Sequence, residues 1–311
     1  MNFLSNGWTS NQMPDLTGKT AIVTGANSGL GFQATKKLAE HNAEVIMACR
    51  KEEKGSEAKE KIEEAIEEAD LKVMQLDLAS LDSISQFTEE FKEEYNDLDL
   101  LFNNAGVMAI PRKQTEDGFE YQFGVNHLGH FALTAQLIET MKKAEEARII
   151  SQSSIAHENG DINFKDINHE EKYNRMQVYS DSKLANLLFI NELDRKLEEK
   201  DINIKAIASH PGVSNTNLFK AEESQHNVII TKLMGLGLKV FGQTPEKGCL
   251  PMLYAATSED VEGGELIGPD GFKAIRGYPE RQTPSEKARD EDIAARLWRK
   301  SEEMTGTEFG L

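Results

Sequence analysis

Residues 19–31 read Lys19-Thr-Ala-Ile-Val-Thr-Gly25-Ala-Asn-Ser-Gly29-Leu-Gly31, and they set the architecture of the chain. The first six residues are mostly apolar or β-branched, which predicts a short buried strand. Residues 32–41 follow with a helical pattern. The sequence therefore predicts a strand, a glycine turn and a helix in direct succession.

The glycines of this turn indicate a nucleotide site. Gly25, Gly29 and Gly31 would permit a tight turn, let a pyrophosphate approach the backbone, and allow the helix to pack close to the strand. The helix N-terminus would face the phosphates with its free N–H groups. Turns also use glycine for steric reasons alone, and the strand and helix on either side favour the nucleotide interpretation. The candidate cofactor-binding residues here are Gly25, Asn27, Ser28, Gly29, Leu30 and Gly31.

Strand and helix patterns alternate along the rest of the chain. This alternation predicts an α/β fold with a parallel sheet covered on both faces and joined by right-handed crossovers. We find no linker in the 311 residues, so we expect a single domain, 1–311, with residues 1–17 as an N-terminal extension and 280–311 as a helical C-terminal extension. The expected strands lie near residues 19–24, 44–48, 72–76, 98–102, 147–151, 203–208 and 265–268.

Tyr179 and Lys183 form a candidate proton-transfer site. They stand four residues apart in Tyr-Ser-Asp-Ser-Lys, which places both on one helical face. A phenol is a poor acid-base catalyst at neutral pH, and a nearby ammonium would lower its pKa. A solvated helix face is the alternative for this pair taken alone.

The spacing Gly-x-x-x-Gly-x-Gly after a threonine resembles the glycine motif of the short-chain dehydrogenase/reductase family. Four further segments fit that family in order and separation, so the resemblance covers residues 19–216 and extends more loosely to the C-terminus. It implies a doubly wound Rossmann fold with about seven parallel strands, and an oxidoreductase that interconverts a carbonyl and an alcohol by hydride transfer. The four segments are Asn103-Asn-Ala-Gly106, Asn126 in Val-Asn-His-Leu-Gly, Ser153-Ser154, and His210-Pro-Gly212.

The resemblance assigns roles to four side chains. Ser154, with Ser153 as the alternative, would hydrogen-bond the substrate oxygen, and Tyr179 would exchange a proton with that oxygen. Lys183 would favour the tyrosinate and hydrogen-bond the nicotinamide ribose. Asn126 would hold water in a proton relay, and a buried asparagine with satisfied hydrogen bonds is the alternative.

The end of the second expected strand indicates which cofactor binds. NAD-binding folds carry an acidic residue there, which would repel a 2′-phosphate. This chain has Cys49 at that position, and Arg50 could make charge-assisted bonds to a phosphate. We therefore expect NADP(H) over NAD(H), the alternative being that Arg50 only begins an exposed helix. The family resemblance also assigns Asp77 and Leu78 to adenine contacts, although Asp77 could equally cap the next helix.

The remaining cofactor contacts are expected from two further motifs. Both follow strands, and ligands of open α/β sheets bind at the carboxyl ends of strands. The residues implied by the resemblance are Asn104, Ala105, Gly106, Pro211, Gly212 and Thr216, together with Tyr179 and Lys183.

Composition excludes several classes of partner. A net charge of −18 opposes binding to nucleic acid or to an anionic membrane surface. Residues 1–17 lack the pattern of a secretion signal, and no stretch is long enough to span a membrane. Cys49 and Cys249 are expected to be reduced thiols in a cytoplasmic protein with no structural metal.

Three regions bear on the substrate. The insert 157–177 is expected to rim the active site, with His157 and His169 as surface residues. This insert, the Ala-Cys-Arg strand ending and the tail Ala294-Ala-Arg-Leu-Trp298 resemble the retinol dehydrogenase-like branch of the family. Residues 213–243 mix apolar side chains with glycines and are expected to form a lid over a lipophilic carbonyl substrate, a permanently packed helix being the alternative.

Two other functions remain open. One is a nucleotide-binding redox sensor without turnover, and the other is an epimerase or dehydratase of the extended branch of the superfamily. A homo-oligomer is possible through the helices expected at 125–141 and 177–199, which relatives use for association.

Overall fold

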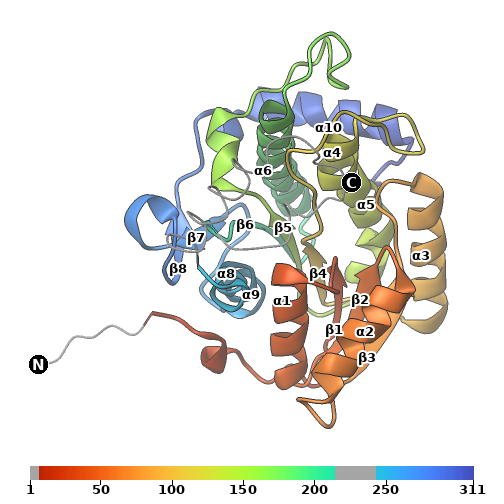
Figure 1. The fold of residues 1–311 in the computed structure, drawn as a ribbon, viewed down its shortest axis with the longest axis vertical. Coiled ribbons are helices and arrows are strands. Elements are labelled where there is room, and N and C mark those ends of the chain that lie inside the picture. The colour runs from red at the N-terminus through yellow and green to blue at the C-terminus, as the bar shows by residue number, and fades with distance from the viewer. Residues whose placement is uncertain (1–6, 214–242) are drawn as a thin grey trace, which may run out of the picture.

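One mixed β-sheet organises the protein. The computed structural model describes residues 7–213 and 243–311, and within them eight strands lie in the order β3-β2-β1-β4-β5-β6-β7-β8 (Figure 1). Neighbouring strands from β3 to β7 are parallel, and β8 runs antiparallel to β7. The predicted parallel sheet is confirmed, with an antiparallel edge strand added. The strands are β1 (Thr20–Thr24), β2 (Glu44–Cys49), β3 (Leu71–Gln75), β4 (Leu100–Asn103), β5 (Ala147–Gln152), β6 (Ile204–Ser209), β7 (Leu266–Pro269) and β8 (Pro279–Gln282).

The edge strand β8 corrects the expectation of a wholly helical C-terminal extension. Leu266 of β7 lies opposite Gln282 of β8, and the terminal helix α10 (Glu291–Thr305) begins only after a further turn. Pro279-Glu-Arg-Gln has no β-branched residue and no apolar alternation, so its own sequence does not predict a strand. Pairing with β7 is what makes this segment a strand.

Helices cover both faces of the sheet and bury two apolar cores. One core contains residues of α1, α2 and α9 against β1 and β2, for example Leu38, Ile62 and Leu253. The other contains residues of α3, α5, α6 and α10. This is the doubly wound arrangement that the alternation predicts. The helices are α1 (Gly29–Glu40), α2 (Glu52–Glu63), α3 (Leu81–Glu94), α4 (Tyr121–Phe123), α5 (Gly129–Met141), α6 (Arg175–Glu199), α8 (Pro245–Gly248), α9 (Leu250–Thr257) and α10.

An aromatic cluster fixes α10 against α5 and α6. The Trp298 ring lies 5.2 Å from Phe131 and 6.0 Å from Phe189, measured between ring centroids, and Phe309 lies 4.4 Å from Trp298. His127 adds a 2.9 Å contact between its Nε2 and Ser301 Oγ. Aromatic pairs of this geometry contribute about 0.5–1.5 kcal/mol each beyond their burial. The C-terminal helix therefore covers part of the α6 surface expected to mediate association.

The crossover from β3 to β4 creates the ligand-binding edge. The chain runs outward from β1 to β3 and then returns to place β4 on the other side of β1. Connections on the two sides of β1 consequently diverge at its carboxyl end. Open α/β sheets bind ligands in the crevice at such a switch point.

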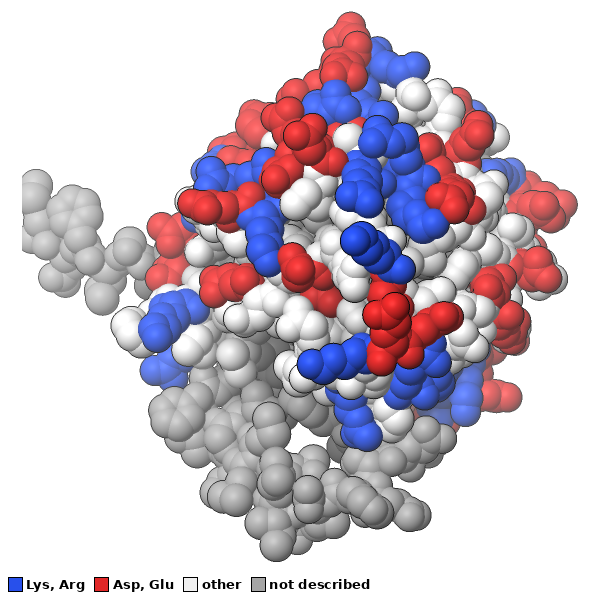
Figure 2. Space-filling model, turned by 90° about the horizontal axis from the view of Figure 1, so that it is seen from above, with Lys and Arg blue, Asp and Glu red and all other residues white. Residues whose placement is uncertain are grey.

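Charges of both signs are interspersed on the surface. Figure 2 shows Lys and Arg side chains lying among Asp and Glu over the upper face. Several are helix pairs, such as Lys37 with Glu40 and Lys59 with Glu63. Exposed pairs contribute about 0.3–0.5 kcal/mol each. Within 7–213 and 243–311, no helix is long and apolar enough to cross a bilayer.

Candidate active site

The glycine turn between β1 and α1 has the close packing that its spacing predicts. Gly25 and Gly29 have φ angles of 67° and 59°, a region that side-chain-bearing residues rarely adopt. A Cβ added to Gly31 would lie 2.5 Å from the Gly25 carbonyl oxygen and 2.6 Å from Asn104 Nδ2. Two of these glycines are therefore required by backbone conformation and the third by the close approach of α1 to the turn.

Thr24 ties this turn to the neighbouring strand, a role that the sequence analysis did not assign. Its Oγ1 accepts hydrogen bonds from the main-chain nitrogens of Asn104 and Ala105, both at 2.9 Å, and donates to Phe102 O at 3.1 Å. Asn104 Nδ2 donates to Thr24 O at 2.7 Å. The sequence does place the Thr24 hydroxyl at the end of a buried apolar strand. Buried hydroxyls need hydrogen-bond partners, so this position indicates a structural role for Thr24.

A cavity of about 280 Å³ opens at the carboxyl ends of β1 and β4. The Ser28 side chain does not cap α1, so the free N–H groups at the start of that helix are available to an anion. Gly31 is not in the lining of this first cavity and packs against Gly25. The cavity brings together most of the predicted cofactor residues: Gly25, Asn27, Ser28, Gly29, Leu30, Arg50, Asp77, Leu78, Asn104, Ala105 and Gly106.

Arg50 lies in the wall of the first cavity and is held by a tyrosine. Its Nη1 donates to Tyr121 OH at 3.0 Å, and Lys113 Nζ lies 3.9 Å from the centre of the same ring. In the described part of the chain, neither cation forms an ion pair with a carboxylate. Cys49 is 1% exposed, and burial raises the pKa of its thiol to about 11. Strand β2 thus ends in a neutral thiol followed by an uncompensated cation.

Asp77 lines the same cavity and also closes a turn. Its Oδ1 accepts a hydrogen bond from Ala79 N at 2.9 Å. Helix α3 is capped by Ser80, whose Oγ accepts from Ser83 N at 3.3 Å. The alternative that Asp77 caps this helix is therefore wrong.

Tyr179 and Lys183 lie one turn apart on α6, both buried. The Lys183 Nζ lies 5.8 Å from the centre of the Tyr179 ring and donates to Gln152 O at 2.9 Å. Burial raises the pKa of Tyr179, an effect opposed by a hydrogen bond with the Ser154 side chain. Burial also lowers the pKa of Lys183 to about 8. The net shift of the Tyr179 pKa is therefore opposite to the lowering expected from the ammonium, because burial of the phenol dominates.

Asn126 lies in a π-helical segment, Gly124–Leu128, between α4 and α5. Its Oδ1 accepts from Val107 N at 2.8 Å, and its Nδ2 donates to Val107 O at 3.0 Å and to Ser182 Oγ at 2.9 Å. The side chain therefore positions the segment after β4 against α6. This is the pattern of the satisfied buried asparagine, and one lone pair of Oδ1 is left for a further partner.

The two serines after β5 face different surroundings. Ser153 is buried, and its Oγ donates to Lys183 O at 2.9 Å, which joins β5 to α6. Ser154 is half-buried and begins the 3₁₀ turn Ile155–Asn159 (η3). Ser154 lines the larger of the two cavities described here, and Ser153 lines neither of them. The geometry therefore favours Ser154 over Ser153 for contact with a ligand.

A second cavity, of about 990 Å³, contains Ser154 and Tyr179 in its wall. Pro211 and Gly212 also line it, so the structure places these two apart from the first cavity. Thr216 and most of the predicted lid lie outside the described residues. At the ends of that segment, Gln243 N donates to Val213 O at 2.9 Å. The larger apolar side chains of the wall are Met108, Ile155, Met176, Val213, Leu266 and Ile275.

Gly106 places Lys183 beside the first cavity. Gly106 lines the first cavity, and a Cβ added to it would lie 3.5 Å from Lys183 Nζ and 3.1 Å from Asn126 Oδ1. Tyr179, one helical turn before Lys183, lines the second. The Tyr179 phenol of the second cavity therefore lies one helical turn from the Lys183 ammonium, which lies beside the first cavity.

Comparison with known sequences agrees with this geometry. The sequence model described as short chain dehydrogenase matches residues 19–227. The chain belongs to the short-chain dehydrogenase family. Members of this family are oxidoreductases that use a nicotinamide cofactor, so general oxidoreduction and nicotinamide binding follow for this short-chain dehydrogenase.

Individual relatives support the retinol dehydrogenase-like branch. Retinol dehydrogenase 13 of Homo sapiens is 40% identical over 294 residues, covering 94% of this chain and 86% of the relative. Retinol dehydrogenase 14 of Homo sapiens is 40% identical over 304 residues, covering 93% and 87%. Among solved structures, an uncharacterised protein from Mycobacterium paratuberculosis has a TM-score of 0.80 at 37% identity, covering 98% of this chain and all of the other. The resemblance inferred from the motifs is therefore confirmed.

The histidines of the insert do not both lie at the surface of this short-chain dehydrogenase. His157 is 4% exposed, so its prediction as a surface residue is wrong. Its Nδ1 lies 2.8 Å from Ser154 O, and Ser285 N donates to its Nε2 at 3.4 Å. His169 is half-buried, with Nε2 at 3.3 Å from Asp181 Oδ2. Packing by the C-terminal segment, distant in sequence, is what buries His157.

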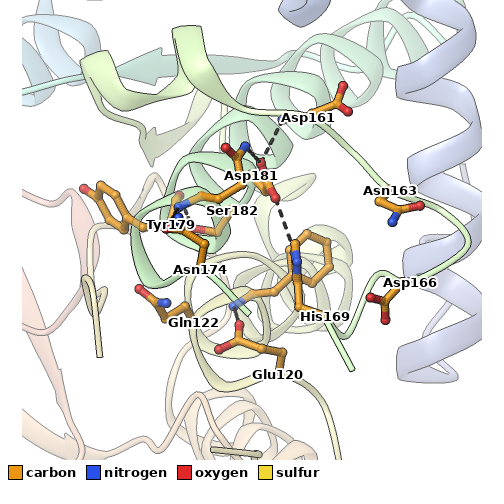
Figure 3. A network of polar contacts seen from close by, with 12 residues as sticks. Glu120, Gln122, Asp161, Asn163, Asp166, His169, Asn174, Tyr179, Asp181 and Ser182 are labelled. Carbon is orange, nitrogen blue, oxygen red and sulfur yellow. Dashed lines mark hydrogen bonds and ion pairs between the residues drawn. The ribbon is translucent and has the colours of Figure 1, made fainter. Parts of the chain in front are cut away.

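A polar network fastens the rest of the insert to α4 and α6 (Figure 3). The buried Glu120 lies 3.0 Å from Tyr173 OH through its Oε1, and burial raises the pKa of its carboxyl. Asp181 of α6 accepts from Asp161 N at 2.8 Å and contacts His169. The two ends of the insert, represented by Glu158 and Met176, line the second cavity as predicted.

No metal site is evident in the described parts of the chain. There, no group of three or more His, Cys, Asp or Glu side chains is arranged to hold an ion. Both cysteines are buried free thiols.

Proposed function

We propose that this chain is an NADP(H)-dependent oxidoreductase that interconverts a lipophilic aldehyde or ketone and its alcohol. Hydride transfer takes place at the junction of the two cavities, with Tyr179 as general acid or base. The single observation that carries the proposal is the placement of Ser154 and Tyr179 in one cavity, one helical turn from the ammonium at the wall of the other.

The first cavity suits a dinucleotide. Its glycine cradle has no room for a Cβ at Gly31, and the N-terminus of α1 offers free N–H groups to a pyrophosphate. Gly106 also lines this cavity, beside Lys183 and Asn126. When bound, the reduced nicotinamide supplies a hydride to the carbonyl carbon.

The chain's own groups handle the proton and the substrate oxygen. Ser154 Oγ donates a hydrogen bond to the carbonyl oxygen and orients it. Tyr179, which like any phenol is protonated at neutral pH, would give its proton to that oxygen during reduction. Lys183 would stabilise the resulting tyrosinate through its charge and would hold the nicotinamide ribose, and Asn126 would support a water that returns a proton to the site. Alcohol oxidation uses the same groups in reverse.

Preference for NADP(H) rests on the end of β2. A carboxylate there would repel a 2′-phosphate, and this chain has a buried neutral thiol instead. Arg50 is held over the cavity by Tyr121 and has no carboxylate partner in the described chain. Its remaining N–H groups are suited to charge-assisted bonds with phosphate oxygens. In a chain of net charge −18, such a cation is a local attraction for an anion.

The second cavity favours a lipophilic substrate. Its wall combines polar groups with the apolar side chains of Met108, Ile155 and Met176, and it is large enough for a drug-sized ligand. The relatives named retinol dehydrogenase bear the name of a lipophilic alcohol.

Neither alternative function accounts for this arrangement. A redox sensor would have no use for buried Tyr179 and Lys183, since burying the ammonium opposes folding. An epimerase or dehydratase of the extended branch would carry Gly-x-x-Gly-x-x-Gly, and the spacing here differs.

A carbonyl screen tests the proposal. Purified protein is mixed with NADPH or NADH and a panel of aromatic, aliphatic and retinoid-like carbonyls, and the absorbance of the reduced nicotinamide is followed. We expect turnover of apolar carbonyls with NADPH. Turnover of small sugars but of no apolar carbonyl would overturn the substrate class, and absence of NADPH binding would overturn the cofactor site.

A further inference from the structure

His157 joins the Ser154 turn to the C-terminal segment. Its ring lines the second cavity, with Nδ1 at 2.8 Å from the main-chain oxygen of Ser154. The His157 N–H donates to the same oxygen at 3.0 Å. On the other side of the ring, Ser285 N donates to Nε2 at 3.4 Å. The ring therefore spans two segments 128 residues apart in sequence.

These partners determine the proton position on the ring. A carbonyl oxygen only accepts, so Nδ1 must carry the hydrogen, and a main-chain N–H only donates, so Nε2 must be bare. The neutral Nδ1–H tautomer is the only form that satisfies both contacts. The other tautomer would break both contacts, and the imidazolium would set Nε2–H against the Ser285 N–H.

The same turn is held at its far end. Lys287 Nζ donates to Gly160 O at 3.1 Å and lies 2.9 Å from Asp161 Oδ1. A Cβ added to Gly160 would lie 2.7 Å from both Leu184 Cβ and Ser180 O, so the turn is pressed against α6. The C-terminal segment thus holds the turn that carries Ser154 against the helix that carries Tyr179.

We propose that His157 is a positioning residue for Ser154, acting through its Nδ1–H, and that the segment Ser285–Lys287 holds it in place. The inference rests on the proposed function, in which Ser154 Oγ orients the substrate carbonyl. Ser154 is half-buried and its Oγ accepts from Ala156 N within the same turn, and the His157 ring links the Ser154 main-chain oxygen to Ser285 of the C-terminal segment. Small displacements of an orienting group lower the rate of the chemical step more than they weaken binding.

Nitrogen NMR of protein labelled in its histidine rings tests the contact without any activity. The account predicts, at neutral pH, a His157 ring protonated at Nδ1 and unprotonated at Nε2. An Nε2–H tautomer or an imidazolium would overturn the inference.

Two substitutions of His157 by amide side chains then test the contributions of Nδ1 and Nε2 separately. In His157→Asn the side-chain amide reaches the position of Nδ1 and can still donate to Ser154 O. In His157→Gln the amide reaches the position of Nε2 and the donor to Ser154 is lost. We expect His157→Asn to keep most of the wild-type kcat, and His157→Gln to lower kcat by about 10- to 100-fold with little change in the dissociation constant of NADPH.

A matched control removes another histidine that contacts a main-chain oxygen. His41 Nδ1 lies 3.1 Å from Pro14 O, at the end of α1 away from both cavities, and His41→Gln should leave kcat unchanged. Equal loss in His157→Asn and His157→Gln, or no loss in either while Ser154→Ala is inactive, would overturn the inference. A wild type that binds NADPH but turns over no carbonyl would count against the proposed function, and the nitrogen spectrum alone would then decide the inference.

Discussion

Lys183 Nζ donates a 2.9 Å hydrogen bond to the main-chain oxygen of Gln152, the last residue of β5. The same oxygen accepts from Asn186 Nδ2 at 3.0 Å. The ammonium is therefore anchored at the carboxyl end of the sheet, with no carboxylate among its contacts in the described chain. A buried charge compensated only by a carbonyl dipole opposes folding, which is why the pKa of Lys183 falls to about 8.

Lys183→Met should stabilise the protein and abolish its turnover. Below pH 8 the wild type must bury a charged ammonium that is charged at no cost in the unfolded chain, so removing it should raise the free energy of unfolding by about 1–3 kcal/mol. Gln152 O keeps its bond from Asn186, so no acceptor is left unpaired. The unfolded chain binds more protons than the native state between pH 8 and about 10.5, so wild-type stability rises there and the advantage of the variant disappears. Urea unfolding across this pH range measures both effects, and a variant less stable than wild type at neutral pH would contradict the account.

Gly31→Ala should prevent NADPH binding and destabilise the fold. The new Cβ would lie 2.5 Å from the Gly25 carbonyl oxygen, and a backbone atom cannot move aside cheaply. Gly18→Ala is the matched control, since Gly18 has a positive φ of 78° but no atom within 4 Å of the added Cβ. The control should lose about 1–2 kcal/mol of stability and keep its affinity for NADPH, measured by nicotinamide fluorescence. Equal affinities in both variants would refute the role of the Gly31 contact.

Arg50→Asp should shift cofactor preference from NADPH toward NADH. The substitution removes a cation and places a carboxylate where it repels a 2′-phosphate. Tyr121→Phe removes only the hydroxyl that accepts from Arg50 at 3.0 Å, so its effect should have the same direction and a smaller size. The ratio of kcat/KM for the two cofactors is the measurement, with Lys54→Gln as an exposed control that lies outside the cavity. An unchanged ratio in Arg50→Asp would remove Arg50 as the selector.

Ser154→Ala and Ser153→Ala should have different consequences. Ser154→Ala removes the group that orients the carbonyl, so kcat should fall by about 100-fold or more while thermal stability changes little. Ser153→Ala leaves Lys183 O without its bond from the buried Oγ, which should cost about 1 kcal/mol of stability and have a smaller effect on kcat. If Ser153→Ala lost more kcat than Ser154→Ala, then Ser153, and not Ser154, would be the serine that orients the carbonyl.

Local signals predicted the sheet and much of the site. The glycine spacing, the apolar strands and the four-residue separation of Tyr179 and Lys183 depend on short-range geometry, and these features could be read from the sequence. Ser154 was preferred to Ser153 through the family resemblance alone; the structure adds that the Ser153 Oγ is bonded to Lys183 O while Ser154 lines the second cavity.

Features that depend on distant segments were missed. The segment Pro279–Gln282 forms a strand because it pairs with β7. The buried His157 contacts Ser285, which lies far away in the sequence. The pKa of Tyr179 was predicted in the wrong direction, since burial outweighs a lysine whose ammonium is bonded elsewhere. None of these could follow from residue spacing, since each is a property of tertiary packing.

In the proposed function, Tyr179 transfers the proton during NADPH-dependent carbonyl reduction. Tyr179→Phe keeps the buried ring and removes only the hydroxyl, so binding and chemistry can be measured separately. The account predicts that kcat for an apolar carbonyl falls by at least about 100-fold while the dissociation constant of NADPH stays close to that of the wild type. Turnover retained at the wild-type rate in Tyr179→Phe would contradict the account.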